Sequence, residues 1–344
     1  MKPIDWDGER LVLLDQRKLP SEVCYLKCST VQDVFDAITK MVVRGAPAIG
    51  VTAAYGLALA MKEYKKNQHE TEYQYLEKVA DKLTKARPTA VNLKWALIKM
   101  MALLGSSEFG DFYDILIKGA QDIHRSDLEG NYKMGNIGAE LIASGSSIIT
   151  HCNAGALATS GYGTALGVIR KASEIGRVEK IYATETRPWF QGSRLTASEL
   201  LSDGLGVTII VDSAAGYLMR SERIDWIIVG ADRVTSNGDV INKIGTYNLA
   251  VLAQRHNVKF MVVAPTSTLD LCSLSGFDVD IEQRSETEVK YYNNQLIAPL
   301  NAKVFNPVFD VTPNNLVDVL VTEKGAIFSP DQEKVERLMD QSNT

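Results

Sequence analysis

The stretch SIITHCNAGALATSGYG, residues 147–163, marks the point where the sequence changes character. A short β-branched run leads into Cys152, and mostly small residues follow it. Before this stretch, from Thr30 to Ser144, apolar residues recur at helical spacing. After it, β-branched runs alternate with segments long enough for crossover helices; these runs are KIYATE (180–185), VTIIVD (207–212), DWIIVGAD (225–232) and KFMVVAP (259–265). The alternation predicts a parallel sheet covered by helices.

The sequence therefore predicts an α/β protein with two domains. Residues 1–125 are expected to form a mainly helical N-terminal domain with short strands at its start. Residues 126–344 are expected to form a Rossmann-like α/β catalytic domain, a parallel sheet flanked by helices. The helical segment around 127–144 fits either side of this boundary. With 344 residues, 45% of them hydrophobic, the chain can fill cores of this size.

Composition excludes several classes of function. The net charge is -5 and no dense Lys/Arg stripe occurs, which argues against a nucleic-acid partner. The longest apolar stretch, residues 48–61, is too short to span a membrane. The N-terminal residues show no apolar segment typical of a secretory signal, so we expect a cytoplasmic protein.

The four cysteines are expected to be free thiols in a reducing compartment. Cys24 and Cys28 have a C-x3-C spacing, but no second ligand pair follows at zinc-finger distance, so no metal site is predicted. We interpret Cys24, Cys28 and Cys272 as structural.

Polar residues stand at the ends of successive predicted strands. The first four runs end in Cys152, Glu185, Asp212 and Asp232. Ligands of open parallel sheets bind beyond the carboxyl ends of the strands, near the point where the strand order reverses. We therefore expect these residues to face one crevice.

Cys152 is the first candidate for chemistry. The alternative is a packed small hydrophobe, the usual fate of a free cysteine. The glycine-rich segment after it favours a functional role, because exposed amides near a helix start attract anions and lower the pKa of a thiol. His151 points to the other face of the strand, so a Cys–His pair is not expected. The segment GYGTALG comes too late after the strand to be a dinucleotide fingerprint, which argues against a nicotinamide cofactor.

Asp232 is expected to act as a general acid. The apolar run before it should desolvate the carboxyl and raise its pKa, so that it holds a proton near neutrality. The alternative is an ion pair with Arg233. Lys243 either contacts a phosphate or lies solvated on a loop.

Two arginines precede predicted helix starts in the N-terminal half. Arg44 and Gly45 come before a helix that begins near Pro47, and Arg87 comes before another. An arginine beside free helix-start amides is a good anion site. Together with Lys243, these positions predict a phosphate-bearing ligand held between the two domains.

The segments VRGAPAIG, ARPTAVNL, CNAGALATSGYGTALGVIR, ETRPWFQGSRLTASEL, NGDVINKIGTYNLAVLA and NPVFDVTP occur in this order. Together they closely resemble the 5-methylthioribose-1-phosphate isomerase family of methionine salvage, and the resemblance covers nearly the whole chain. The wider superfamily includes ribose-1,5-bisphosphate isomerases and regulatory subunits of the eukaryotic initiation-factor exchange complex, so the fold alone does not decide the function.

The resemblance implies a homodimeric enzyme without cofactor or metal. It places the catalytic cysteine at Cys152 and the catalytic aspartate at Asp232. The substrate-contacting positions that it implies are Arg44, Gly45, Ala46, Arg87, Gln191, Asn242 and Lys243. The implied reaction turns 5-methylthioribose 1-phosphate into the 2-ketose by acid-assisted ring opening and hydrogen transfer from C2 to C1. Cys152 as a thiolate can remove the C2 proton, and a hydride shift is the other route.

Departures from the family pattern leave the 5-substituent open. Ser198 stands in LTASEL where the family usually has tryptophan, Ile241 stands in INKIGTY where alanine is common, and Gln283 stands where glutamate is expected. Loss of an apolar wall at Ser198 favours 5-deoxyribose 1-phosphate as an alternative substrate. Ribose 1,5-bisphosphate would need a second cation cluster, for which Arg194 and Arg284 are unassigned. A non-catalytic subunit that senses sugar phosphates or nucleotides is a further alternative.

Overall fold

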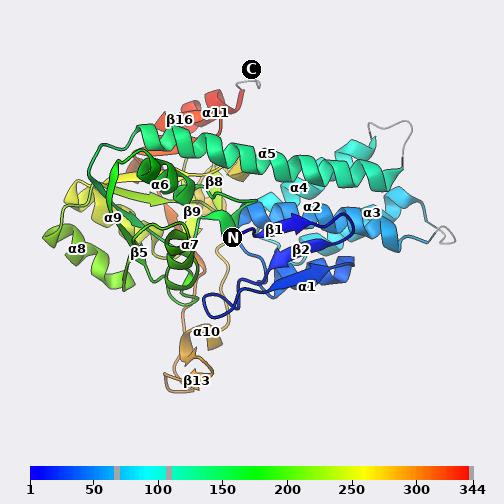
Figure 1. The fold of residues 1–344 in the computed structure, drawn as a ribbon, viewed down its shortest axis with the longest axis horizontal. Helices are drawn as coiled ribbons and strands as arrows, with labels where there is room; N and C mark the ends of the chain where they lie inside the picture. Colours follow the sequence, from blue (N-terminus) through cyan, green and yellow to red (C-terminus); the bar gives the residue numbers. More distant parts are fainter. Residues whose placement is uncertain (66–69, 106–110, 341–344) are drawn as a thin grey trace.

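The computed structural model describes residues 1–65, 70–105 and 111–340 (Figure 1). The N-terminal part begins with an antiparallel sheet of β1 (Ile4–Trp6), β2 (Leu11–Leu14) and β3 (Tyr25–Cys28). The helices that follow are α1 (Val31–Thr39), α2 (Ala46–Glu63), α3 (Glu72–Thr84), α4 (Val91–Gly105) and α5 (Phe112–Glu140).

Helix α2 is the centre of the N-terminal part. Residues 46–60 are all buried, as expected for a helix that is apolar on every side. Helices α1, α3, α4 and α5 pack around it. Its first turn, with Pro47 as the second residue, faces the C-terminal part, so burial of α2 fixes the position of the residues just before it.

The C-terminal part is built on a seven-stranded sheet. Its strands are β4 (Ser146–Thr150), β5 (Val178–Thr184), β6 (Thr208–Ile210), β7 (Trp226–Val229), β10 (Lys259–Val263), β15 (Val319–Thr322) and β16 (Gly325–Phe328). The order is β16-β15-β10-β7-β4-β5-β6, and only β16 is antiparallel to its neighbour. The chain runs outward from β4 in one direction and then from β7 in the other, so the strand order reverses between these two strands.

Helices cover both faces of this sheet (Figure 1). One core contains Ile148 and side chains of α5, α6 (Ala165–Glu174) and α7 (Ala197–Ser202). The other contains Ile149 and side chains of α8 (Ala215–Ser221), α9 (Thr246–His256) and α11 (Gln332–Asp340). Neighbouring residues of β4 thus face opposite cores, as the period of two in a strand requires.

A smaller sheet lies beside the ends of these strands. It consists of β11 (Leu269–Asp270), β8 (Arg233–Thr235), β9 (Val240–Lys243) and β14 (Phe309–Thr312), in that order. Between β11 and β14 the chain makes an excursion that carries α10 (Thr287–Lys290), β12 (Tyr291–Tyr292) and β13 (Gln295–Leu296). Figure 1 shows the end of this excursion protruding from the body.

The predicted fold class is confirmed, because all five predicted strands lie in one sheet flanked by helices. The small sheet and the strands β15 and β16 were not predicted. Helix α5 runs through the predicted boundary at residues 125 and 126 and packs on both α2 and α6, so the division into domains stays a prediction. No helix of the described residues is long and apolar enough to cross a membrane.

Gly192 offers a test of the packing between β5 and the π-helical turn Gly192–Thr196. A Cβ atom at this position would lie 1.7 Å from the carbonyl oxygen of Thr184. Because the backbone must shift, Gly192→Ala should lower the free energy of unfolding by at least ~1–3 kcal/mol, as measured by urea denaturation. At Gly206 a Cβ would meet nothing within 4 Å. Gly206→Ala should therefore stay within ~0.5 kcal/mol of the parent; equal effects of the two changes would contradict the packing.

Candidate active site

Cys152 and Asp232 follow the two strands at which the strand order reverses. Strands β4 and β7 are hydrogen-bonded neighbours in the sheet, with Thr150 paired to Ile228. Cys152 lies two residues after β4, and Asp232 lies three residues after β7. Both side chains therefore reach the crevice in which open α/β sheets bind ligands.

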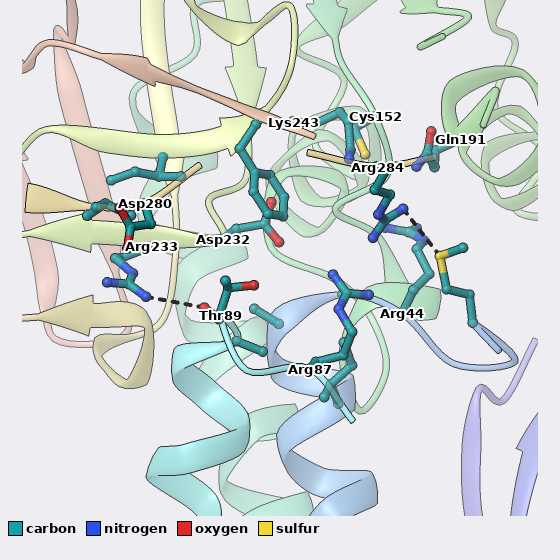
Figure 2. Close-up of a pocket in the computed structure, with 18 residues that line it drawn as sticks. Arg44, Arg87, Thr89, Cys152, Gln191, Asp232, Arg233, Lys243, Asp280 and Arg284 are labelled. Carbon is teal, nitrogen blue, oxygen red and sulfur yellow. Dashed lines mark hydrogen bonds between the residues drawn. The ribbon is translucent and has the colours of Figure 1, made fainter. Parts of the chain in front are cut away.

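The first turn of α2 closes this crevice and makes it a cavity (Figure 2). Besides Cys152 and Asp232, the predicted site residues that line it are Arg44, Gly45, Ala46, Arg87, Gln191 and Lys243. Asn242 lines an adjoining hollow that shares Arg44, Cys152 and Asp232 with the cavity. The structure thus brings all nine predicted site residues to one place.

The backbone at Cys152 is held in an uncommon conformation. Its φ is 59°, in the left-handed region that residues other than glycine rarely adopt. The amide of Cys152 donates a hydrogen bond of 2.9 Å to Oγ1 of Thr186, and the carbonyl accepts one of 2.6 Å from Oγ1 of Thr196. These two bonds fix the turn that directs the thiol into the cavity.

Glu199 organises the loop that follows Cys152. Its side chain is 2% exposed and accepts hydrogen bonds from the amides of Ala156 (2.7 Å) and Leu157 (3.2 Å) and from Nδ2 of Asn153 (2.8 Å). Arg170 forms an ion pair with it at 2.8 Å. The expectation that the glycine-rich loop offers free amides to an anion is therefore wrong for these two amides, because a carboxylate of the protein already occupies them.

The loop in turn orients Arg44. Nη1 of Arg44 donates to the carbonyl of Asn153 at 2.9 Å, and Nη2 donates to Oδ1 of the same residue. Gly45, with a φ of +99°, lets the start of α2 approach Ala158, whose Cα would lie 2.5 Å from a Cβ at this glycine. Close contact between the two halves of the chain thus depends on a residue without a side chain.

Several polar atoms around the cavity have no hydrogen-bond partner. Among the described residues, these buried atoms include Nε of Arg44, Nε of Arg87 and Oε1 of Gln191. Unpaired buried polar groups are rare in folded proteins because each costs free energy. Their gathering at one cavity indicates a ligand that carries hydrogen-bond acceptors and at least one donor.

Burial controls the protonation of the acid in the site. It raises the pKa of Asp232, and the nearby Lys243, Arg87 and Arg44 offset only part of this rise. The side chain is partly accessible, because it faces the cavity. The sequence-based expectation of a raised pKa at Asp232 is thus met, and no salt bridge to Arg233 forms, since Arg233 pairs with Asp270 at 2.9 Å.

Lys243 ends strand β9 and is not on a solvated loop. It is 7% exposed, and Nζ donates to the carbonyl of Val308 at 3.0 Å and lies 4.8 Å from the ring centre of Phe309. Burial lowers its pKa to about 8, although Cys152 and Asp232 oppose this shift. Lys243 is therefore a cation near neutral pH that loses its charge in mildly alkaline solution.

The pKa of the Cys152 thiol is shifted in the direction opposite to the one expected from the sequence. Burial raises its pKa, while Arg44 and Lys243 lower it by less. The predicted effect of the loop amides on the thiol is overcome by desolvation. His151 supplies no base, because both ring nitrogens have other partners, Oγ1 of Thr184 at 2.6 Å and the carbonyl of Ile244 at 2.9 Å.

Of the residues at which the chain departs from the family pattern, Ile241 lines the cavity, whereas Ser198 and Gln283 do not. The hydroxyl of Ser198 donates to the carbonyl of Arg194 at 2.6 Å. Arg194 donates to backbone carbonyls of the N-terminal part, including that of Gln16 at 2.8 Å. The backbone of Gln283 forms an isolated antiparallel β-bridge with that of Pro307. Arg284, by contrast, does line the cavity, although it was left unassigned in the sequence analysis.

No group of three or more His, Cys, Asp or Glu side chains suited to hold a metal ion occurs within the described residues. Cations outnumber carboxylates among the charged residues that line the cavity, with Arg44, Arg87, Arg233, Lys243 and Arg284 against Asp232 and Asp280. This donor set suits an anionic ligand better than a metal.

Comparisons with known proteins agree on one family. The family model described as "Initiation factor 2 subunit family" matches residues 42–329. A methylthioribose-1-phosphate isomerase of Xanthomonas oryzae is 49% identical over 336 residues, which cover 98% of this chain and 95% of that protein.

Two solved structures are similar over nearly the full length. The 5-methylthioribose 1-phosphate isomerase of Pyrococcus horikoshii superposes with a TM-score of 0.89 and 40% identity, over 99% of this chain and 96% of the other. A protein described as translation initiation factor eIF-2B, subunit delta, from A. fulgidus superposes with a TM-score of 0.85 and 43% identity, over 98% and 99% of the two chains.

Anion binding should depend on pH through Lys243. Sulfate stays a dianion across the range, so the protein alone titrates. Because the ammonium is charged below its pKa of about 8 and neutral above it, sulfate affinity should fall by about tenfold or more as pH rises through this value. Lys243→Arg keeps the charge and should remove the fall. Isothermal titration calorimetry measures both, and identical pH profiles would contradict the assignment.

Proposed function

We propose that this chain, which belongs to the initiation factor 2 subunit family, is a methylthioribose-1-phosphate isomerase, an aldose–ketose isomerase of methionine salvage. Relatives that carry this name are about half identical to it over 98% of its length. The observation that carries the proposal is the cavity between α2 and the sheet, where a buried acid and a thiol lie among cations with unpaired donors.

The substrate of such an enzyme is locked as a ring, because its anomeric oxygen is esterified with phosphate. Isomerisation must therefore begin with ring opening. Asp232 has a pKa raised by burial, and its carboxyl faces the cavity. We propose that it gives its proton to the ring oxygen as the bond between C1 and this oxygen breaks.

The second half of the reaction regenerates the acid. Once the ring is open, C1 is an electron-deficient oxocarbenium centre that carries the phosphate oxygen. We propose that the hydrogen on C2 moves to C1 with its bonding electrons, as a hydride, while the hydroxyl on C2 loses its proton and becomes a carbonyl. Asp232, left as a carboxylate by the first step, is the base beside the substrate that can accept this proton. The enzyme then returns to its starting state, and the product is an isomer of the substrate.

Cys152 is proposed to act as a neutral thiol and not as the thiolate expected from the sequence. Burial raises its pKa, and only the field of Arg44 and Lys243 counteracts this. A phosphate dianion bound to these cations would weaken that field. The thiol would then stay protonated in the complex and donate a hydrogen bond to the oxygen on C2, where charge changes during the reaction.

The cavity wall supports a methylthio group as the 5-substituent. Its apolar lining includes Met41, Ile49, Ile241, Val279 and Phe309. A thioether packs well against such side chains, and a second phosphate would not. The alternative substrate 5-deoxyribose 1-phosphate was favoured because serine at position 198 was expected to remove an apolar part of the cavity wall. Ser198 does not line the cavity, so this argument for the deoxy sugar falls away.

We also propose a homodimer, as the family resemblance implies. The protruding excursion exposes large apolar side chains, among them Phe305 (83% exposed) and Leu300 (63%). Apolar patches of this kind mark protein contacts. Analytical ultracentrifugation should give twice the chain mass of 37.8 kDa, and a monomer at micromolar concentration would contradict the proposal. The cytoplasmic location stays a prediction, which cell fractionation would test.

Turnover of 5-methylthioribose 1-phosphate and 5-deoxyribose 1-phosphate, measured side by side by NMR detection of the ketose, tests the activity. We expect a clear preference for the methylthio sugar. Asp232→Asn and Cys152→Ala should each lower kcat by about a hundredfold or more with the fold intact. Cys272→Ala, at an exposed thiol outside the cavity, is the control and should leave kcat unchanged.

The outcomes separate the alternatives. A preference for the deoxy sugar would contradict the methylthio assignment. Near-normal turnover in both site variants would contradict the roles of Asp232 and Cys152. A folded protein that turns over neither sugar would contradict the isomerase proposal and favour a sugar-phosphate sensor.

A further inference from the structure

Arg284 is a cation of the cavity for which no role was predicted from the sequence. It comes from the excursion between β11 and β14, far in sequence from the other cations. Its side chain is 13% exposed, so the charge is largely removed from bulk water. A buried guanidinium normally has its donors engaged, because leaving them unpaired is costly.

The backbone around Arg284 is well anchored. Its amide donates to the carbonyl of Asn306 at 3.0 Å, and the amide of Val308 donates to the carbonyl of Glu282 at 2.9 Å. The carbonyl of Val308 also accepts the hydrogen bond from Lys243. This paired segment therefore places Arg284 and Lys243 on the same side of the cavity.

The guanidinium of Arg284 is only partly engaged by the protein. Nε donates to Oε1 of Glu282 at 3.0 Å, and Nη1 reaches only Sδ of Met41 at 3.5 Å, which is a weak acceptor. The carboxylate of Glu288 lies 3.9 Å from Nη1, beyond hydrogen-bond distance. Within the described residues, Nη2 has no hydrogen-bond partner.

Arg87 lies close enough to Arg284 for the two positive charges to repel each other. Burial and then the charge of Arg284 lower the pKa of Arg87. Its side chain is 15% exposed and donates no hydrogen bond among the described residues; its nearest anion is Glu282 at 3.9 Å. Figure 2 shows the guanidinium groups of Arg44, Arg87 and Arg284 pointing into the same region of the cavity, each from a different segment.

We propose that Arg284 is a further substrate-binding residue, and that it holds the phosphate group of the sugar together with Arg87. Two guanidinium groups with free N–H donors, facing each other across a cavity, need an anion between them, and the planar fork suits phosphate oxygens. Glu282 leaves room for this ligand, because it engages only Nε of Arg284. The inference rests on the proposed function, which supplies the phosphate-bearing substrate.

The test measures binding of inorganic phosphate by isothermal titration calorimetry, at a pH where Lys243 is charged. Arg284→Gln should bind phosphate about ten- to a hundredfold more weakly than the parent. Arg220→Gln, an exposed site on α8 outside the cavity, removes the same charge and should leave affinity unchanged. In turnover, Arg284→Gln should raise KM much more than it lowers kcat, as expected for a group that binds substrate and transition state alike.

Arg284→Lys is the second variant and keeps the charge without the fork. We expect several-fold weaker phosphate binding than in the parent, and this variant decides the matter if Arg284→Gln does not fold. Phosphate affinity within about twofold of the parent in the folded Gln variant, or an equal loss in Arg220→Gln, would overturn the proposal. Unchanged affinity in Arg284→Lys would overturn the role of the fork.

Phosphate binding needs no catalysis, so the two hypotheses can fail separately. A parent protein that binds phosphate through Arg284 but isomerises neither sugar contradicts the proposed function alone. A parent that isomerises the sugar, with unchanged phosphate affinity after loss of Arg284, contradicts this inference alone.

Discussion

The buried carboxylate of Glu199 is the interaction on which the site depends. It forms an ion pair with Arg170 and accepts hydrogen bonds from two backbone amides of the loop after β4. It also accepts a hydrogen bond from the side-chain amide of Asn153, which fixes the orientation of that amide. With Nδ2 of Asn153 directed toward Glu199, Oδ1 is left to accept Arg44. A helix of the C-terminal part thereby sets the orientation of an arginine that precedes α2. Removing one partner from such a network leaves buried groups unpaired, so its members act together.

This arrangement explains how the chain holds several cations in one cavity. Burial, and after it the charges of neighbouring arginines, lower the pKa of Arg87 and of Lys243, so the charged forms of both are disfavoured there. Each of three cations is held by a hydrogen bond to another part of the protein. Arg44 donates to Asn153, Arg284 donates to Glu282, and Lys243 donates to the carbonyl of Val308. Nε of Arg44 and Nε of Arg87 remain unpaired, and both residues line the cavity. A site built in this way is organised before its ligand arrives, which reduces the cost of binding.

Sequence patterns predicted the sheet and much of the site because both follow from short-range rules. β-Branched runs separated by helices imply parallel strands, and the carboxyl ends of such strands meet at one edge, which brought Cys152 and Asp232 together. The small sheet was missed because β8 and β9 have only three and four residues, and because β14 joins them from a distant part of the chain. Glu199 and Arg284 were missed for a similar reason: a charged residue on a helix or in an irregular segment usually lies in solvent, and only tertiary contacts bury these two.

The error about the thiol follows from the same limitation. The amides that were expected to stabilise a thiolate at Cys152 are bound by Glu199, and burial then dominates its pKa. Cations remain nearby, but they also bind the phosphate of the substrate. The negative charge of the bound phosphate weakens the stabilisation that these cations would give to a thiolate. If the thiol stays protonated, Asp232 is left as the group that exchanges protons with the substrate. The carboxyl suits this role because burial favours its protonated form before the reaction, and the surrounding cations stabilise its carboxylate after the first proton transfer.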